Sequence, residues 1–151
     1  MSKKKQKVVH QPNAARNKRV IQYDQSTDTR CLIWIFDAVD VDGDFNFDPK
    51  RSDFDAEEIF AKLIHFSKRT WSEIKKDTHD DGRSKHHFLN DARLSPEAEK
   101  RISRLNLDDQ RDQIFSLSLS NMCRIIGLRD HEYFRVKWFD PKHKFCPSQK
   151  K

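Results

Sequence analysis

Glycine is scarce in this sequence, with three residues among 151. A phosphate-binding loop of the P-loop or dinucleotide-binding type needs several glycines in a short stretch, because the backbone must approach the phosphate closely. Gly43, Gly82 and Gly127 stand far apart along the chain. The sequence therefore argues against a nucleotide-dependent enzyme of either type.

Long apolar runs and paired cysteines are missing as well. No stretch approaches the roughly 18 consecutive apolar residues of a membrane helix, and the basic start MSKKKQKVV lacks the apolar segment of a secretory signal. The cysteines, Cys31, Cys123 and Cys146, are odd in number and form no C-x-x-C pair. These absences predict a cytoplasmic, reduced protein with no membrane partner and no disulfide framework.

Charge is abundant and unevenly distributed. Hydrophobic residues make up 35% of the chain and charged residues 36%, which predicts a small core and a well-solvated surface. The net charge of +6 comes from the ends, because residues 1–19 carry seven Lys or Arg and residues 141–151 carry four Lys, with no acid in either. The body between them has more acids than bases.

This distribution predicts the domain organisation. We expect residues 1–29 to be a basic, largely disordered tail, residues 30–148 to form a single domain, and residues 149–151 to be a basic end. The tail either contacts nucleic acid through its phosphates or only keeps the chain in solution.

The strongest strand signals lie near the C-terminus. Runs rich in branched and aromatic residues are separated by short polar corners, which is typical of successive antiparallel strands. The second corner is too short for a parallel crossover. Asp140-Pro141 ends the last run, since proline cannot donate to a strand ladder. The predicted three-stranded meander comprises residues 114–119, 123–128 and 133–139.

The first half predicts one strand and a turn. Residues 31–39 form its most apolar run, which we expect to be a buried, central strand around Trp34. Asp42-Gly43 then favours a tight turn that pairs residues 39–41 with residues 45–47 as a hairpin. The calcium-loop alternative fails, because Phe45 stands where an EF-hand requires glycine.

Capping residues predict three helices. Asp55 and Thr70 are each followed three residues later by glutamate, as in a capping box. Ser95 precedes Pro96, and proline is tolerated at the first helical position. The whole pattern predicts an α+β domain with a mostly antiparallel sheet, whose C-terminal meander is packed by two or three helices grouped on one side.

Two resemblances extend this interpretation. Trp71-Ser72-Glu73-Ile74, His86-His87, Arg124-Ile125 and the ending WFDPKHKFCPS resemble a family of small bacterial and phage-borne proteins. More remotely, the segment SLSLSNMCRI at residues 116–125, with a following strand that delivers His143-Lys144, resembles the sheet core of the RelE and HigB toxins. Strand, two helices and three strands is also the order of elements in that family.

The second resemblance implies a RelE-like fold and activity. Such toxins cleave mRNA, typically on the ribosome, and are silenced by an antitoxin protein. RNA or the ribosome and an antitoxin are therefore the implied partners. The chain departs from the family at Ser118, where a basic residue is frequent, and in an extra segment at about residues 77–111.

Candidate catalytic residues gather after the last predicted strand. RNA cleavage by internal transesterification needs a base, an acid and positive charge on the phosphate. His143, with Lys142 and Lys144 and with Arg124 or Arg135 from neighbouring strands, would provide these groups without a metal or another cofactor. The alternative is that His143 and its lysines form a solvated strand end and that Arg124 pairs internally.

Further residues are candidates for nucleic-acid binding. Arg135 offers charge, Trp138 either stacks on a base or belongs to the core, and His86 and His87 are expected to line the same groove. His79 and its neighbouring acids also suggest a metal site, although adjacent histidines on a strand point to opposite faces. We assign no metal ligand.

The sequence thus predicts a RelE-like toxin, a metal-independent endoribonuclease. A non-catalytic protein- or nucleic-acid-binding module is the alternative. The oligomeric state is left open.

Overall fold

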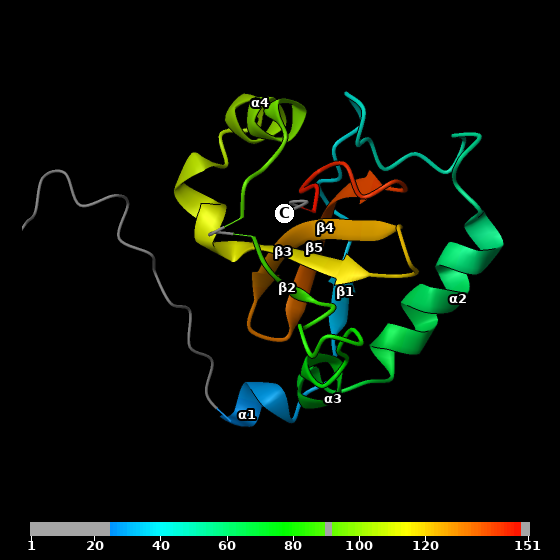
Figure 1. Ribbon diagram of the computed structural model, residues 1–151, viewed down its shortest axis with the longest axis vertical. Helices are drawn as coiled ribbons and strands as arrows, with labels where there is room; N and C mark the ends of the chain where they lie inside the picture. Colours follow the sequence, from blue (N-terminus) through cyan, green and yellow to red (C-terminus); the bar gives the residue numbers. More distant parts are fainter. Residues whose placement is uncertain (1–24, 90–91, 149–151) are drawn as a thin grey trace, which may run out of the picture.

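The computed structural model describes residues 25–89 and 92–148. The predicted tail up to residue 24 and the basic end at residues 149–151 lie outside the described residues. The α+β class is confirmed, because helices pack on a five-stranded mixed sheet (Figure 1). None of the helices in the described part of the chain is long and apolar enough to cross a membrane.

Ten elements follow one another along the chain. They are α1 (Gln25–Asp28), β1 (Ile33–Ile35), α2 (Ala56–Ser67), α3 (Trp71–Lys75), β2 (His87–Phe88), α4 (Pro96–Arg104), the 3₁₀ helix η1 (Asp108–Gln113), β3 (Ile114–Ser118), β4 (Arg124–Asp130) and β5 (Tyr133–Asp140).

The C-terminal meander is confirmed. β3, β4 and β5 pair antiparallel in sequence order, and the sheet order is β1-β5-β4-β3-β2. One irregularity interrupts the pairing of β4 with β5: Ile126 pairs with Trp138, whereas the next residue, Gly127, pairs with Val136. Lys137 is therefore an extra residue, and this β-bulge reverses which face of the sheet the following side chains meet.

Helices cover both faces of the sheet, which corrects the expectation that they are grouped on one side. α2 and α3 pack on one face, and α4 packs on the other (Figure 1). Each face has its own hydrophobic cluster, and the bulge sends Trp138 to the α4 cluster and Phe139 to the α2 cluster. The α4 packing could not be inferred from its amphipathic pattern, because that pattern does not say which face receives it.

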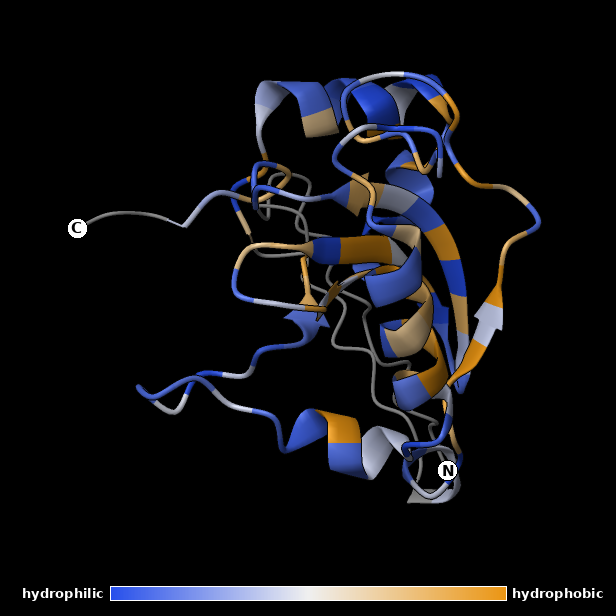
Figure 2. Cartoon of the chain, turned by 90° about the vertical axis from the view of Figure 1, so that its right-hand side faces the viewer, coloured by the Kyte–Doolittle hydropathy of each residue, from blue (hydrophilic) through white to orange (hydrophobic). Residues whose placement is uncertain are grey.

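The predicted central strand is instead a short edge strand. β1 spans three residues and pairs only with β5, in the parallel direction. Trp34 is half-buried, with its indole N–H donated to the Leu63 carbonyl at 2.8 Å. Periodicity identified an apolar run here, but the run lies at the sheet edge, where Ile33 and Phe36 are each 46% exposed. In Figure 2, β1 is the short arrow at the right with mostly hydrophobic colouring.

The hairpin predicted after this strand is also wrong. The turn exists, since Gly43 has a φ of +80° and Phe47 donates its N–H to the Asp40 carbonyl at 2.9 Å. No strand forms there among the described residues, because the backbone binds β5 instead: Asp40 donates its N–H to Lys137, and Phe45 accepts one from Phe139.

The helix starts follow the predicted capping chemistry. The Asp55 carboxylate accepts the N–H of Glu58 at 3.1 Å, Thr70 caps α3 in the same way, and the Ser95 hydroxyl accepts the N–H of Ala98 at 3.2 Å. Each bond satisfies one of the N–H groups that a helix start leaves without an intrahelical partner. These three helices begin where the sequence predicts.

Residues 25–28, assigned to the tail, form α1. Thr27 is buried, and Asp28 binds the Lys75 ammonium group at 2.9 Å. This contact places α1 beside α3, at the end of the molecule opposite α4 (Figure 1).

Gly127 provides a test of the bulge. A Cβ at this position would lie 2.1 Å from the Arg135 carbonyl oxygen, closer than real Cβ atoms approach. Gly127→Ala should therefore lower the free energy of unfolding by about 3 kcal/mol, as overpacking against backbone does, measured by urea denaturation. Gly82→Asn is the control, because Gly82 has a φ of +84° and open space around it, and asparagine tolerates that conformation. A normal stability for Gly127→Ala would contradict the close approach of β4 and β5.

Candidate functional site

Several strand ends meet at one end of the sheet. β3 ends, β4 begins and β5 ends there, since Ser118 pairs with Arg124 and Arg124 pairs with Asp140. β2 begins at the same end, where His87 pairs with Ser116. The meander thus brings Arg124 and the residues after Asp140 to the same end of the sheet.

A buried carboxylate shapes the chain after β5. Asp140 is 1% exposed, and its two oxygens accept the N–H groups of Lys144 and Phe145, each at 2.9 Å. Phe145 is fully buried against Trp138, with ring centroids 4.9 Å apart. His143, between these anchors, has a φ of +55°. We call residues 141–148 the C-terminal strap.

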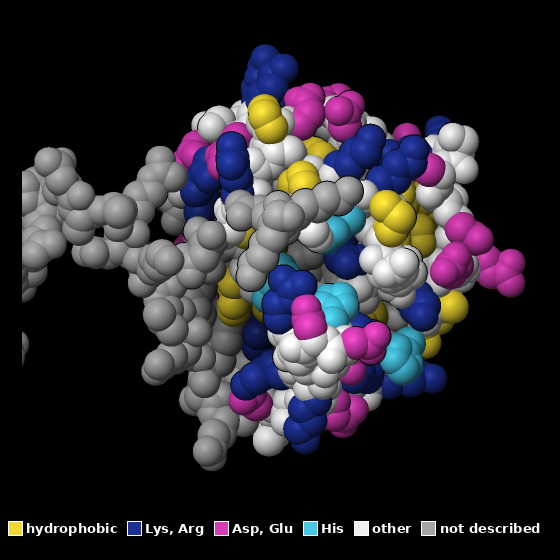
Figure 3. All heavy atoms as spheres, viewed as in Figure 1, with side chains coloured by type: hydrophobic (Ala, Val, Ile, Leu, Met, Phe, Trp, Pro, Cys, Tyr) yellow, Lys and Arg dark blue, Asp and Glu magenta, His cyan; other side chains and the backbone are white. Residues whose placement is uncertain are grey.

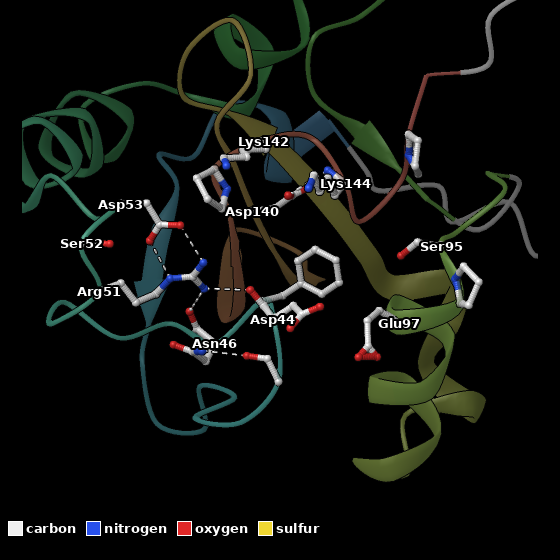
Figure 4. A pocket seen from close by; sticks show the side chains of 15 residues that line it. Asp44, Asn46, Arg51, Ser52, Asp53, Ser95, Glu97, Asp140, Lys142 and Lys144 are labelled. Carbon is white, nitrogen blue, oxygen red and sulfur yellow. Dashed lines mark hydrogen bonds and ion pairs between the residues drawn. The ribbon is translucent and has the colours of Figure 1, made fainter.

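The strap divides the predicted lysine–histidine cluster between two clefts. His143 lines a cleft of about 540 Å³, here called the histidine cleft. The other residues of its lining are Thr78, His79, Asp80, Asp81, Arg83, Lys85, Asn121, Arg124 and Ser148. Lys142 and Lys144 line a different cleft of about 910 Å³, opposite Ser95 and Glu97 of the α4 start (Figure 4). The turn at Pro141 and Lys142 and the left-handed backbone of His143 point the lysines and the imidazole into different clefts, so the three residues do not share one site.

Arg124 lies in the histidine cleft but is largely engaged. It is 5% exposed, and its guanidinium group donates to the carbonyl oxygens of Ser120 at 2.8 Å, Cys123 at 3.1 Å and Asn121 at 3.3 Å. Burial lowers the pKa of Arg124, and the Asp140 carboxylate offsets part of that effect. Arg124 therefore fixes the β3–β4 loop while its positive charge faces the cleft.

Two histidines near Arg124 are held towards the neutral form. Burial lowers the pKa of His143, and the charge of Arg124 lowers it further. Desolvation also lowers the pKa of His87, and Arg124 again adds to the effect. The Nδ1 atom of His143 lies 3.5 Å from the Ser148 hydroxyl. On the face drawn in Figure 3, histidine side chains lie close together among side chains of both charges, lysines and arginines as well as acids.

His79 is a member of the cleft that the sequence did not assign to it. It stands on a short hairpin-like loop, where His79 and Arg83 are joined by a backbone hydrogen bond of 2.8 Å and Gly82 makes the turn. The extra segment at residues 77–111 thus contributes one wall of the site. The sequence signal was the Asp-Gly turn between polar residues, which indicated a loop but not where it folds.

His86 has a different environment from its neighbour His87. His86 is 5% exposed and its ring is fixed at both nitrogens: Nδ1 accepts the Ser118 N–H at 3.0 Å, and Nε2 lies 2.9 Å from the Asp77 carboxylate. Arg69 binds the same carboxylate, and these bonds lower the pKa of Asp77 to about 2. His86 is thus part of a structural network rather than a surface available to RNA, whereas His87 is exposed.

The other predicted nucleic-acid contacts lie elsewhere. Trp138 is fully buried and donates its indole N–H to the Asp40 carboxylate at 2.9 Å, so it belongs to the core. Arg135 binds Asp37 at 2.9 Å beside the β1 edge and does not line the histidine cleft. Of the eight predicted site residues, the cleft itself contains Arg124 and His143.

Comparisons with protein-family models, curated proteins and solved structures gave no match. The site is therefore interpreted from its own geometry. Within residues 25–89 and 92–148, no group of three or more His, Cys, Asp or Glu is arranged to hold a metal ion.

The His86 network predicts a pH dependence of stability. Burial is the main cause that lowers the pKa of His86 in the folded protein, and the Asp77 carboxylate offsets it only in part. The unfolded chain therefore binds the proton more readily than the folded chain. The contribution of neutral His86 to the free energy of unfolding is complete above about pH 6.5. It is lost as the pH falls through the lower pKa of the folded protein. Protonation also removes the Nδ1 lone pair that accepts the Ser118 N–H.

Urea unfolding of the wild type and His86→Gln between pH 7.5 and about pH 5 tests this expectation. The wild type should lose more stability on acidification than the variant, because the variant has no imidazole to protonate. Parallel pH profiles would show that His86 does not couple folding to pH.

Proposed function

We propose that this chain is a metal-independent endoribonuclease related to the RelE-like toxins, and that the histidine cleft is its catalytic site. The observation that carries the proposal is the convergence of His143, His79 and Arg124 from three separate segments on one cleft. Two imidazoles and a fixed positive charge are the groups that internal transesterification of RNA requires.

The environment of His143 suggests its role, and the second proton transfer is assigned to the other imidazole of the cleft, His79. His143 has a lowered pKa, so it is neutral at pH 7 and accepts the proton of the 2′-hydroxyl group as that oxygen attacks the phosphorus. His79 donates a proton to the leaving 5′-oxygen. The products are a 2′,3′-cyclic phosphate and a free 5′-hydroxyl group, which balance without water or metal.

Arg124 acts on the phosphate through its charge. Its guanidinium N–H groups are donated to three carbonyl oxygens of the β3–β4 loop, so a bidentate clamp on the phosphate would require that loop to open. A fixed charge in a partly desolvated cleft still stabilises the additional negative charge of the transition state. Lys85, which is exposed on the same cleft, can contact the phosphate directly.

The order of elements adds support from the family resemblance. β1, then α2 and α3, then the β3–β5 meander follow the RelE-like order. β2, α4 and η1 are inserted between the helices and the meander. If the resemblance extends to biology, the substrate is mRNA on the ribosome and an antitoxin protein is the partner.

A non-catalytic RNA-binding module is the alternative. The engagement of Arg124 with the loop carbonyls favours it, because a structural arginine can support a phosphate-binding groove without taking part in chemistry. Cleavage assays separate the two functions directly.

His143→Asn tests the catalytic proposal. The variant should reduce RNA cleavage by about 10²- to 10⁴-fold, the typical contribution of a proton-transfer group. Asparagine tolerates the positive φ of this position, so the melting temperature should stay close to that of the wild type. The assay uses purified RNA with and without ribosomes.

His131→Asn is the matched control. His131 has a φ of +54° and is exposed at the β4–β5 turn, at the other end of the meander, so its replacement should leave cleavage unchanged. The 2′-deoxy form of the cleaved nucleotide should block the reaction in the wild type. A wild-type protein that cuts no RNA in either setting would exclude the enzyme and leave the binding module.

A further inference from the structure

The histidine cleft continues into a second cleft beside α2. This second cleft, here called the α2 cleft, has a volume of about 410 Å³ and is lined by Lys62, His65, Arg69, Asp77, His86 and the β3–β4 loop. His79, Lys85 and Asn121 line both clefts. The two hollows are therefore neighbours that share one wall.

The basic side chains along the two clefts differ in whether a carboxylate neutralises them. Arg69 is neutralised by Asp77, with N–O distances of 2.5 and 2.7 Å. Lys62 and Lys85 form no ion pair with any residue in the described part of the chain within 4.0 Å. Their ammonium groups are free to bind the phosphates of a ligand.

The cleft on the other side of the strap is less suited to a polyanion. Lys142 and Lys144 face it, but so do the carboxylates of Asp44 and Glu97, and Asp53 there is paired with Arg51 at 2.8 Å (Figure 4). Its lining contains more acids than bases. Of these two clefts, the α2 cleft therefore presents the net positive charge to an RNA strand that leaves the histidine cleft.

We propose that the α2 cleft is a substrate subsite that holds the flanking phosphates of a single-stranded RNA, with Lys62 and Lys85 as the phosphate contacts. This inference rests on the proposed function for the position of the cleaved RNA bond, and it adds the direction in which the RNA continues from that bond. Single-stranded RNA is required because in-line attack by the 2′-oxygen needs a backbone free to bend, and a regular helix does not allow it.

Replacing Lys62 and replacing Lys85 should affect RNA binding differently, because the two lysines line different parts of the two clefts. Lys62 lines the α2 cleft but not the histidine cleft, whereas Lys85 lines both. Loss of one phosphate contact on single-stranded RNA lowers the slope of log K against log salt by about 0.7, which corresponds to roughly a three- to fivefold loss of affinity at physiological salt.

The experiment compares kcat/KM for a dinucleotide and an octanucleotide. Lys62→Gln should lower the value for the octanucleotide about three- to fivefold and leave the dinucleotide unchanged, while Lys85→Gln should lower both. Lys142→Gln and Lys144→Gln are the matched controls on the other side of the strap and should change neither. Thermal melts confirm that all four variants are folded.

A second arm uses a 2′-deoxy octanucleotide, which cannot be cut, and measures its Kd at several salt concentrations. Lys62→Gln should reduce the salt slope by about 0.7. If the wild type cuts no RNA but this loss of slope is found, the catalytic proposal fails and the subsite stands. If Lys62→Gln behaves as the wild type in both arms, or if Lys142→Gln has the larger effect on the octanucleotide, the subsite proposal is overturned even in an active enzyme.

Discussion

The carboxylate of Asp140 is the constraint on which the site depends. A buried carboxylate requires partners, and Asp140 finds them in two backbone N–H groups four and five residues further on. The chain after β5 must therefore turn back over the sheet end, and the burial of Phe145 fixes the other end of the turn. His143 reaches its cleft because both ends of a short, tight segment are held. Without that anchor its imidazole would be on an unrestrained end of the chain.

The histidines illustrate how environment separates residues of one type. His86 has both ring nitrogens committed, one to a backbone N–H and one to a carboxylate, so its ring orients neighbouring elements and has no atom left for a substrate. His143 and His79 line an open cleft near a buried arginine. Composition counts seven histidines in the chain, but only the fold distinguishes these two situations.

Hydrogen bonds between near neighbours in the chain could be predicted from the sequence, whereas the position of an element in the sheet could not. Helix starts at Asp55, Thr70 and Ser95 depend on a side chain and an N–H group three residues away, so the sequence contains all that is needed. The meander follows from short corners for the same reason. In contrast, the apolar run around Trp34 has the same composition whether it is central or at an edge. Only pairing with β5, about a hundred residues later, decides between them.

In the candidate site, too, some features could be predicted from the sequence and others could not. Arg124 and His143 could be placed at one end of the sheet from strand directions alone. The wall formed by His79 could not, because nothing local determines where a polar loop folds. The assignment of Lys142 and Lys144 to the same site failed because the strap is a tight turn, in which the contacts of Asp140 and Phe145 determine where each side chain points.

The extra residue in β5 determines to which face of the sheet the side chains after it point. Because Lys137 has no partner in β4, every residue after it points to the face opposite the one that a regular strand would give. Deletion of Lys137 itself would join Val136 to Trp138 in a regular strand and would leave both side chains on the faces that they now occupy. An insertion or deletion of one residue between Trp138 and Asp140 would instead turn the Asp140 carboxylate to the opposite face, away from the N–H groups that it now binds, and the strap would lose its anchor. Insertions and deletions of a single residue should thus be far more damaging between Trp138 and Asp140 than in the loop around Gly82, where the chain can absorb a change in length without changing the face of any core side chain.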